Sequence, residues 1–153
     1  MPGNIDPIFA KQQNASNVGI WTSSLTANVK SDGTSTGIAT DMVKIFTAGA
    51  NGAFVQKVRF TPSASTAGTA TTASVHRLYL STIASGATTR TDTFQIAEMA
   101  APAQTADQTT TATVPLEIPL GFAMPASTTL LWSMHHAAAA NTSWQAIVFG
   151  GDY

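Results

Sequence analysis

Hydrophobic and polar residues alternate with a period of two along several stretches of this sequence. Between Trp21 and Val29 the odd positions are small or apolar, and the even positions are polar. The alternation is sharpest from 113 to 120, where the even positions are Val114, Leu116, Ile118 and Leu120. Because successive side chains of a strand point to opposite faces of a sheet, this period predicts strands with one buried and one exposed face.

Further segments bring the set to about eight predicted strands. They are 42–47, 53–61, 75–81, 93–99, 129–134 and 143–149. Segment 75–81 carries apolar residues on both faces, which predicts a central strand covered on both sides. Segment 93–99 places Phe94 and Ile96 on one face, which is typical of a strand.

Two local signals predict how some of these strands pair. Asn51-Gly52 separates segments 42–47 and 53–61. Both residue types tolerate positive φ and favour a type I′ turn, so the two segments are expected to form a hairpin. In segment 113–120, Pro115 and Pro119 both lie on the outward set, which predicts an edge strand with one side unpaired.

The connections at 61–72, 82–90 and 100–111 are longer than hairpin turns require, and they are rich in Gly, Pro, Ser, Thr and Ala. Long crossings between short strands favour two packed sheets over a simple meander. The sequence therefore predicts an all-β fold: a single-domain, antiparallel, jelly-roll-like β-sandwich of about eight strands. This domain is expected to span 17–153.

Residues 1–16 differ from the rest of the chain and are expected to form an extended N-terminal arm. Two prolines and a glycine within the first seven residues disfavour regular structure. The apolar anchors of the arm are Ile5, Ile8 and Phe9. Such an arm either packs back onto its own sandwich or lies on a neighbouring subunit or shell, and both fates stay open. These three residues are the candidate partner-binding residues of the sequence.

Charged residues make up only 10% of the chain, with 7 basic and 8 acidic residues. A charge this sparse cannot neutralise a run of phosphates, so we expect neither nucleic acid nor a membrane surface as a partner. A weakly charged surface tends to associate, which favours a permanent assembly. A Thr-rich β surface explains the same composition, because Thr suits exposed strand positions.

The chain contains no cysteine, which excludes disulfides, thiol nucleophiles and thiolate metal sites. No run of apolar residues approaches the roughly 20 needed for a membrane-spanning helix. The first residues, Met1 to Asp6, lack the basic and apolar regions of a signal peptide. We therefore expect a protein that is made in a cytosol and is not exported by the ordinary route.

Three histidines are the first candidates for chemistry. His135 and His136 are adjacent, and on a strand their rings would point to opposite faces and could not chelate one metal ion. His76 lies in a strand among apolar neighbours. We interpret all three as hydrogen-bonded structural histidines.

The carboxylates and glycines form no recognisable catalytic pattern. Glu98 and Glu117 are the only carboxylates on predicted strands, and a glycosidase pair would require the fold to bring them together. The nucleophile-elbow, Walker and dinucleotide-binding glycine patterns are absent from the sequence. We therefore expect no catalytic residue, cofactor or metal site, and we do not expect an enzyme.

Three tryptophans could instead form a sugar-binding platform. Trp21, Trp132 and Trp144 each lie on an alternating strand among other apolar residues. That setting favours places in the core for all three.

The alternating strands, the loops rich in Thr, Ala and Gly, and the ending from Trp144 to Tyr153 resemble small jelly-roll virion proteins of tailed bacteriophages. The resemblance is to capsid decoration, or cement, proteins, and it spans the whole chain without a diagnostic motif. It implies a structural virion protein, made in the host cytoplasm, that forms a homotrimer and binds the major capsid protein or another virion protein. The alternative is a host-recognition or glycan-binding module of a phage tail or fibre, which would make contact through its loops.

Overall fold

The computed structural model describes residues 17–106 and 112–153 of the chain, and its regular structure there is entirely β. The strands are β1 (Val18–Thr22), β2 (Val43–Thr47), β3 (Ala53–Ala64), β4 (Thr69–Ala70), β5 (Ser74–Ser81), β6 (Thr93–Ala101), β7 (Thr105–Ala106), β8 (Leu116–Met124), β9 (Thr129–Met134) and β10 (Thr142–Asp152).

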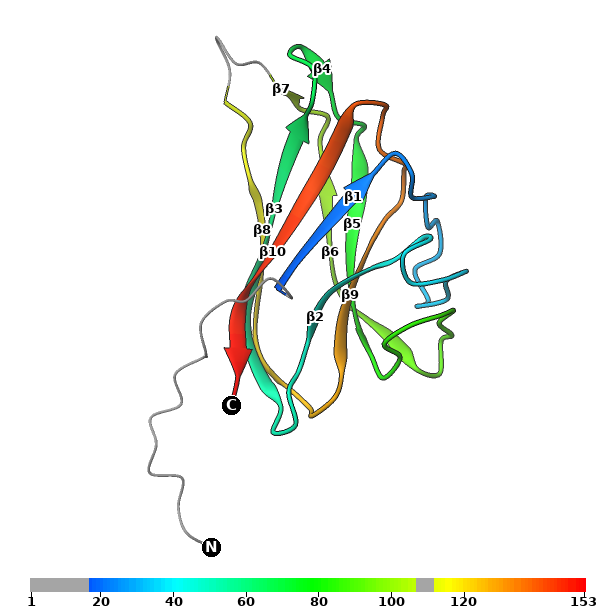
Figure 1. Ribbon diagram of the computed structural model, residues 1–153, viewed down its shortest axis with the longest axis vertical. Coiled ribbons are helices and arrows are strands. Elements are labelled where there is room, and N and C mark those ends of the chain that lie inside the picture. Colours follow the sequence, from blue (N-terminus) through cyan, green and yellow to red (C-terminus); the bar gives the residue numbers. More distant parts are fainter. Residues whose placement is uncertain (1–16, 107–111) are drawn as a thin grey trace, which may run out of the picture.

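Two antiparallel sheets pack face to face (Figure 1). One sheet has the order β1-β10-β3-β8 and the other has the order β2-β9-β5-β6, while β4 and β7 form a separate short ribbon. If the eight longer strands of the described residues are counted along the chain, the two orders become 1-8-3-6 and 2-7-4-5. This is the arrangement of a jelly roll, so the predicted fold class is confirmed.

The core lies between the two sheets and is built around large aromatic side chains. Trp21, Trp132 and Trp144 are all fully buried, which confirms their predicted places in the core. Trp21 and Trp132 lie with their ring centroids 5.5 Å apart, and Phe60 lies 5.1 Å from Trp132. Each sheet contributes to this layer, because Trp21, Phe60 and Trp144 come from one sheet and Trp132 from the other.

The predicted hairpin between segments 42–47 and 53–61 is wrong. β2 pairs with β9, and β3 pairs with β10 and β8, so the two segments belong to opposite sheets. The Gly52 N–H donates to the Gly49 carbonyl at 3.1 Å, and Gly52 has a φ of 88°. Asn51 does not have the positive φ that a type I′ turn requires. A short turn therefore does form at Gly49–Gly52, but it links a strand of one sheet to a strand of the other.

The first strand also differs from its prediction over 21–29. β1 ends at Thr22, where the Leu25 N–H donates to the Thr22 carbonyl at 3.1 Å and turns the chain. Val29, expected on the buried face, is 65% exposed. Alternating small residues such as Ser and Ala carry little burial free energy, so their period did not determine the conformation here.

The position of the proline-containing strand is confirmed, with shifted bounds. β8 occupies the edge of its sheet and pairs only with β3 among the described strands. It begins at Leu116, so Val114 lies outside the strand and is 64% exposed instead of buried. Ile118 is buried as predicted, and Pro119 lies opposite Lys57 of β3.

The structure confirms both remaining strand predictions, as β5 and β6. β5 lies between β9 and β6, and both Leu78 and Tyr79 on its two faces are fully buried, as expected for a central strand. On β6, however, Phe94 is 55% exposed and Ile96 is 36% exposed. A register shift leaves Ile96 without a partner on β5, and β6 is an edge strand, so these apolar side chains reach solvent.

Candidate functional site

The outer faces of the two sheets differ in whether other parts of the chain cover them. Residues 23–42, drawn in blue to cyan at the right of Figure 1, cover the outer face of the β2-β9-β5-β6 sheet. The Tyr79 hydroxyl on this face donates to the Lys30 carbonyl at 3.1 Å, and the Asn28 N–H donates to the Met134 carbonyl at 2.9 Å. Met42 packs on Tyr79 and Leu131 to form a second small core. This outer face is therefore a buried layer.

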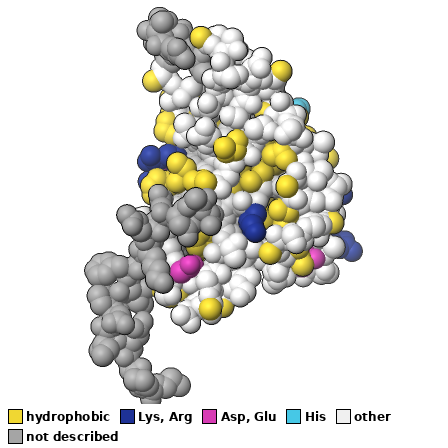
Figure 2. All heavy atoms as spheres, in the orientation of Figure 1, with side chains coloured by type: hydrophobic (Ala, Val, Ile, Leu, Met, Phe, Trp, Pro, Cys, Tyr) yellow, Lys and Arg dark blue, Asp and Glu magenta, His cyan; other side chains and the backbone are white. Residues whose placement is uncertain are grey.

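The outer face of the β1-β10-β3-β8 sheet instead leaves apolar side chains exposed. Val18 and Ile20 on β1 are 47% and 53% exposed. Ile147 lies opposite Val18 on β10, and Phe149 follows on the same face, both partly exposed. We call Val18, Ile20, Ile147 and Phe149 the β1–β10 patch. Figure 2 shows hydrophobic side chains gathered on this side of the molecule, beside basic side chains.

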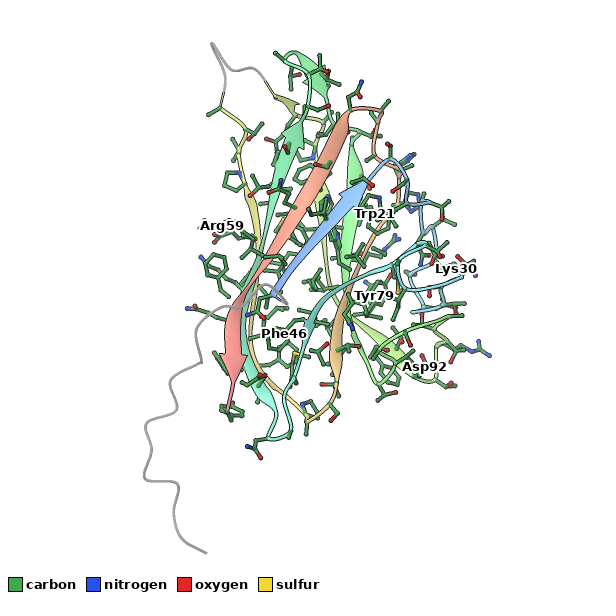
Figure 3. All side chains as sticks on the ribbon, in the orientation of Figure 1. Trp21, Lys30, Phe46, Arg59, Tyr79 and Asp92 are labelled. Atoms are coloured by element: carbon green, nitrogen blue, oxygen red, sulfur yellow. The ribbon has the colours of Figure 1, made fainter. Side chains whose placement is uncertain are left out.

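Basic side chains form one margin of the β1–β10 patch. Lys57 Nζ lies 5.0 Å and the Arg59 guanidinium carbon 5.1 Å from the centre of the Phe149 ring, which are cation–π distances. Figure 3 labels Arg59 at this edge of the molecule. Glu117 on β8 accepts hydrogen bonds from Lys57 Nζ at 2.9 Å and Arg59 Nε at 2.8 Å. These contacts form a row of side chains across the outer face, from Phe149 on β10 through the two basic residues of β3 to Glu117 on β8.

The electrostatics of this margin leave it with a net positive charge. Hydrogen bonds from Lys57 and then from Arg59 lower the pKa of Glu117, so its carboxylate is ionised at neutral pH. Two cations and one anion give a net charge of +1 beside the patch. An apolar centre with an Arg-containing polar rim is the usual anatomy of a protein–protein interface.

The predicted partner-binding residues Ile5, Ile8 and Phe9 lie outside the described residues. The described chain begins at Asn17, directly before Val18 of the β1–β10 patch. Sequence reasoning therefore marked the segment that leads into the patch and missed the patch itself. The available signal was the pair Val18 and Ile20, which alternates with the buried Trp21.

Within the described part of the chain, His76 lacks the hydrogen bonds predicted for it, and His135 and His136 do not lie on a strand. His76 is fully buried, and both of its ring nitrogens lack a hydrogen-bond partner among the described residues. β9 ends at Met134, so His135 and His136 lie beyond the strand, with their rings in contact at a centroid distance of 5.2 Å. They therefore do not point to opposite faces.

The two strand carboxylates are not brought together. Glu98 on β6 pairs with Arg77 at 3.3 Å, and Glu117 lies on the opposite sheet. Within residues 17–106 and 112–153, no three His, Asp or Glu side chains are grouped in a way that could hold a metal ion.

Comparison with protein-family models, curated proteins and solved structures gives no match for this chain. No helix of the described part of the chain is long and apolar enough to cross a membrane.

Proposed function

We propose that this protein is a structural virion protein of a tailed bacteriophage, which binds and stabilises the capsid as a decoration or cement protein. The observation that carries the proposal is the difference between the two outer faces. One is sealed by residues 23–42, and the other presents the β1–β10 patch with its basic margin. Large exposed apolar side chains grouped on one face mark protein-binding surfaces.

The mechanism of such a protein is additive binding, not chemistry. Each copy contributes modest apolar contacts, made to the shell or to neighbouring copies, through the β1–β10 patch and through Ile5, Ile8 and Phe9. Simultaneous engagement of many copies multiplies these contacts over a closed shell. The proposed partners are the major capsid protein, or another virion protein, and further copies of the chain in a homotrimer. The low charge of the chain supports this, because few charges oppose its association.

The jelly-roll order of the strands supports the proposal as an analogy. Jelly rolls occur in viral capsid domains and in lectins, so the architecture suits both the proposed function and the alternative. The patch favours the first of these, because it is apolar and lies on a sheet face rather than on the loops.

The test is co-sedimentation of the full-length protein with empty capsids of the phage that encodes it. We expect saturable binding by the wild type, and a loss of at least tenfold in affinity for Ile20→Asp, which places a charge in the patch. Val29→Asp is the matched control, because Val29 is an exposed aliphatic residue away from this face. Equal binding by both variants would remove the patch from the proposal.

Deletion of residues 1–11 separately tests the arm, and it should weaken capsid binding. A wild-type protein that ignores capsids but binds host cells or a glycan panel would replace the proposal with the recognition module. A protein that binds none of these would overturn both.

A further inference from the structure

The β1–β10 patch has a complementary segment in this same sequence. Residues 5–9 read Ile-Asp-Pro-Ile-Phe, three large apolar residues around a single carboxylate. The patch offers the reverse combination, with apolar side chains on β1 and β10 beside Lys57 and Arg59. Asp6 is the only acidic residue of 1–16, and the margin has one cation in excess of Glu117. The segment and the patch are therefore both apolar, and the charges beside them are of opposite sign.

The position of β1 and the sequence before it favour a second copy as the source of this segment. Val18 lies opposite Ile147 in an antiparallel pair, so the described chain begins beside the end of the patch that carries Phe149. At about 3.3 Å per residue, an extended chain places Phe9 roughly 30 Å before Val18. The intervening residues 10–17 contain no glycine or proline, the residues that most often reverse a chain.

We propose that Ile5, Asp6, Ile8 and Phe9 of one copy bind the β1–β10 patch of a second copy. The apolar side chains cover Val18, Ile20 and Phe149, and the Asp6 carboxylate accepts hydrogen bonds from Lys57 or Arg59. Each copy gives its arm to one neighbour and receives an arm from another. Such a head-to-tail contact closes into a ring when the rotation between copies permits, and a trimer is one such ring. The inference deepens the proposed function by naming the occupant of the patch, and it is tested without capsids.

The absence of cysteine allows a direct test by cross-linking. Two single-cysteine variants of the full chain are prepared: Ala10→Cys beside the arm anchors, and Gln145→Cys, which lies opposite Ile20 and is exposed. The two proteins are mixed, left to exchange subunits and oxidised. We expect a disulfide-linked species of twice the chain mass. Val29→Cys replaces Gln145→Cys as the matched control and should give at least tenfold less of it.

A chain that carries both Ala10→Cys and Gln145→Cys distinguishes the remaining arrangements. A closed chain of single mass, with no cross-link in the mixture, would show that the arm binds its own patch and would overturn the inference. Absence of any cross-link above the control would also overturn it.

Oligomer size provides an independent readout by light scattering. Asp6→Lys should shift the wild-type oligomer towards monomer, because it sets like charges against the basic margin. The double variant Asp6→Lys, Lys57→Glu should regain at least part of the oligomer. A monomeric wild type would contradict the inference even if the protein bound capsids. An arm-linked oligomer that ignores capsids would instead contradict only the proposed function.

Discussion

His76 is an ionisable residue at the centre of the aromatic core. Its ring lies 4.7 Å from Phe60, 4.6 Å from Trp144 and 5.5 Å from Trp132, measured between centroids. The contacts with Phe60 and Trp144 are edge-to-face, a preferred geometry for aromatic pairs. Burial lowers the pKa of His76 from 6.5 to about 3, because the surrounding rings cannot solvate an imidazolium. The folded protein therefore holds this ring neutral.

This burial predicts a loss of stability in mild acid. The unfolded chain binds a proton at His76 below pH 6.5, whereas the folded chain does so only near pH 3. The His76 contribution is thus complete above pH 6.5 and declines by about 1.4 kcal/mol per pH unit as the pH falls. When the pH is lowered from 7 to 4.5, the free energy of unfolding should fall in both proteins. The fall should be smaller in His76→Leu than in the wild type, by on the order of 2 kcal/mol.

Urea unfolding of both proteins at the two pH values measures this difference. The comparison within each protein cancels any change in stability that the leucine itself causes at pH 7. If both proteins lost the same free energy on acidification, His76 would not be the acid-sensitive group.

At the scale of elements, the pairing of β10 with β3 contains a bulge that depends on Gly150. The register shifts between Phe149 and Gly150, where Lys57 and Val55 are successive partners. A Cβ atom on Gly150 would lie 2.3 Å from the Phe54 carbonyl oxygen and 2.9 Å from Val55 Cα. The bulge therefore brings the two backbones too close for any side chain, and it lies next to Phe149 of the β1–β10 patch.

Gly150→Ala should therefore destabilise the domain by about 1–3 kcal/mol, because the backbone of β3 has to move. Chemical denaturation measures the change. Gly37→Ala is the matched control: its Cβ would meet only the Thr40 side chain, with Oγ1 at 3.1 Å, and we expect a smaller effect. Equal effects of the two substitutions would mean that the close approach at the bulge is not what requires glycine.

The strands themselves were largely predictable, because their alternating side chains divide between core and solvent wherever the apolar residues are large. Trp132, Trp144 and Ile118 were assigned correctly for this reason. Prediction failed where the signal was weak or misleading. The residues that follow Thr22 are mostly small, so the strand predicted over 21–29 ends at Thr22. The Asn51-Gly52 turn was visible, but no local signal distinguishes a hairpin from a crossing between sheets.

At the scale of the whole molecule, the strands that the structure describes in the two sheets run from Val18 to Asp152. The two four-stranded sheets are closed by pairing between distant segments, such as β1 with β10, and the core between them is built from these strands. We therefore expect the sandwich to fold without residues 1–16.

The fragment 17–153 should consequently fold with the same β-rich circular dichroism spectrum as the full chain. Its melting temperature, measured below the concentration at which copies associate, should lie within about 5 °C of the full-length value, a difference of roughly 1 kcal/mol for a domain of this size. A fragment that was unfolded would place residues 1–16 within the folded domain and would contradict the boundary predicted at 16.

The β1–β10 patch was missed because the predicted strand began at Trp21 and left out Val18 and Ile20, although both alternate with Trp21. Only the pairing of β1 with β10 shows that these two residues lie on a strand beside Ile147, on an outer face that the described residues leave exposed. The segment of Ile5, Ile8 and Phe9 was recognisable because apolar residues among prolines lie outside any strand.

The sequence by itself determined the β character of this protein, the aromatic composition of its core and the low charge of its surface, because these follow from the side-chain period and composition. Tertiary structure alone decided which strands share a sheet, which outer face residues 23–42 cover and which face is left open. Those outcomes depend on contacts between residues far apart in the chain, and a local pattern of side chains carries no information about its distant partner.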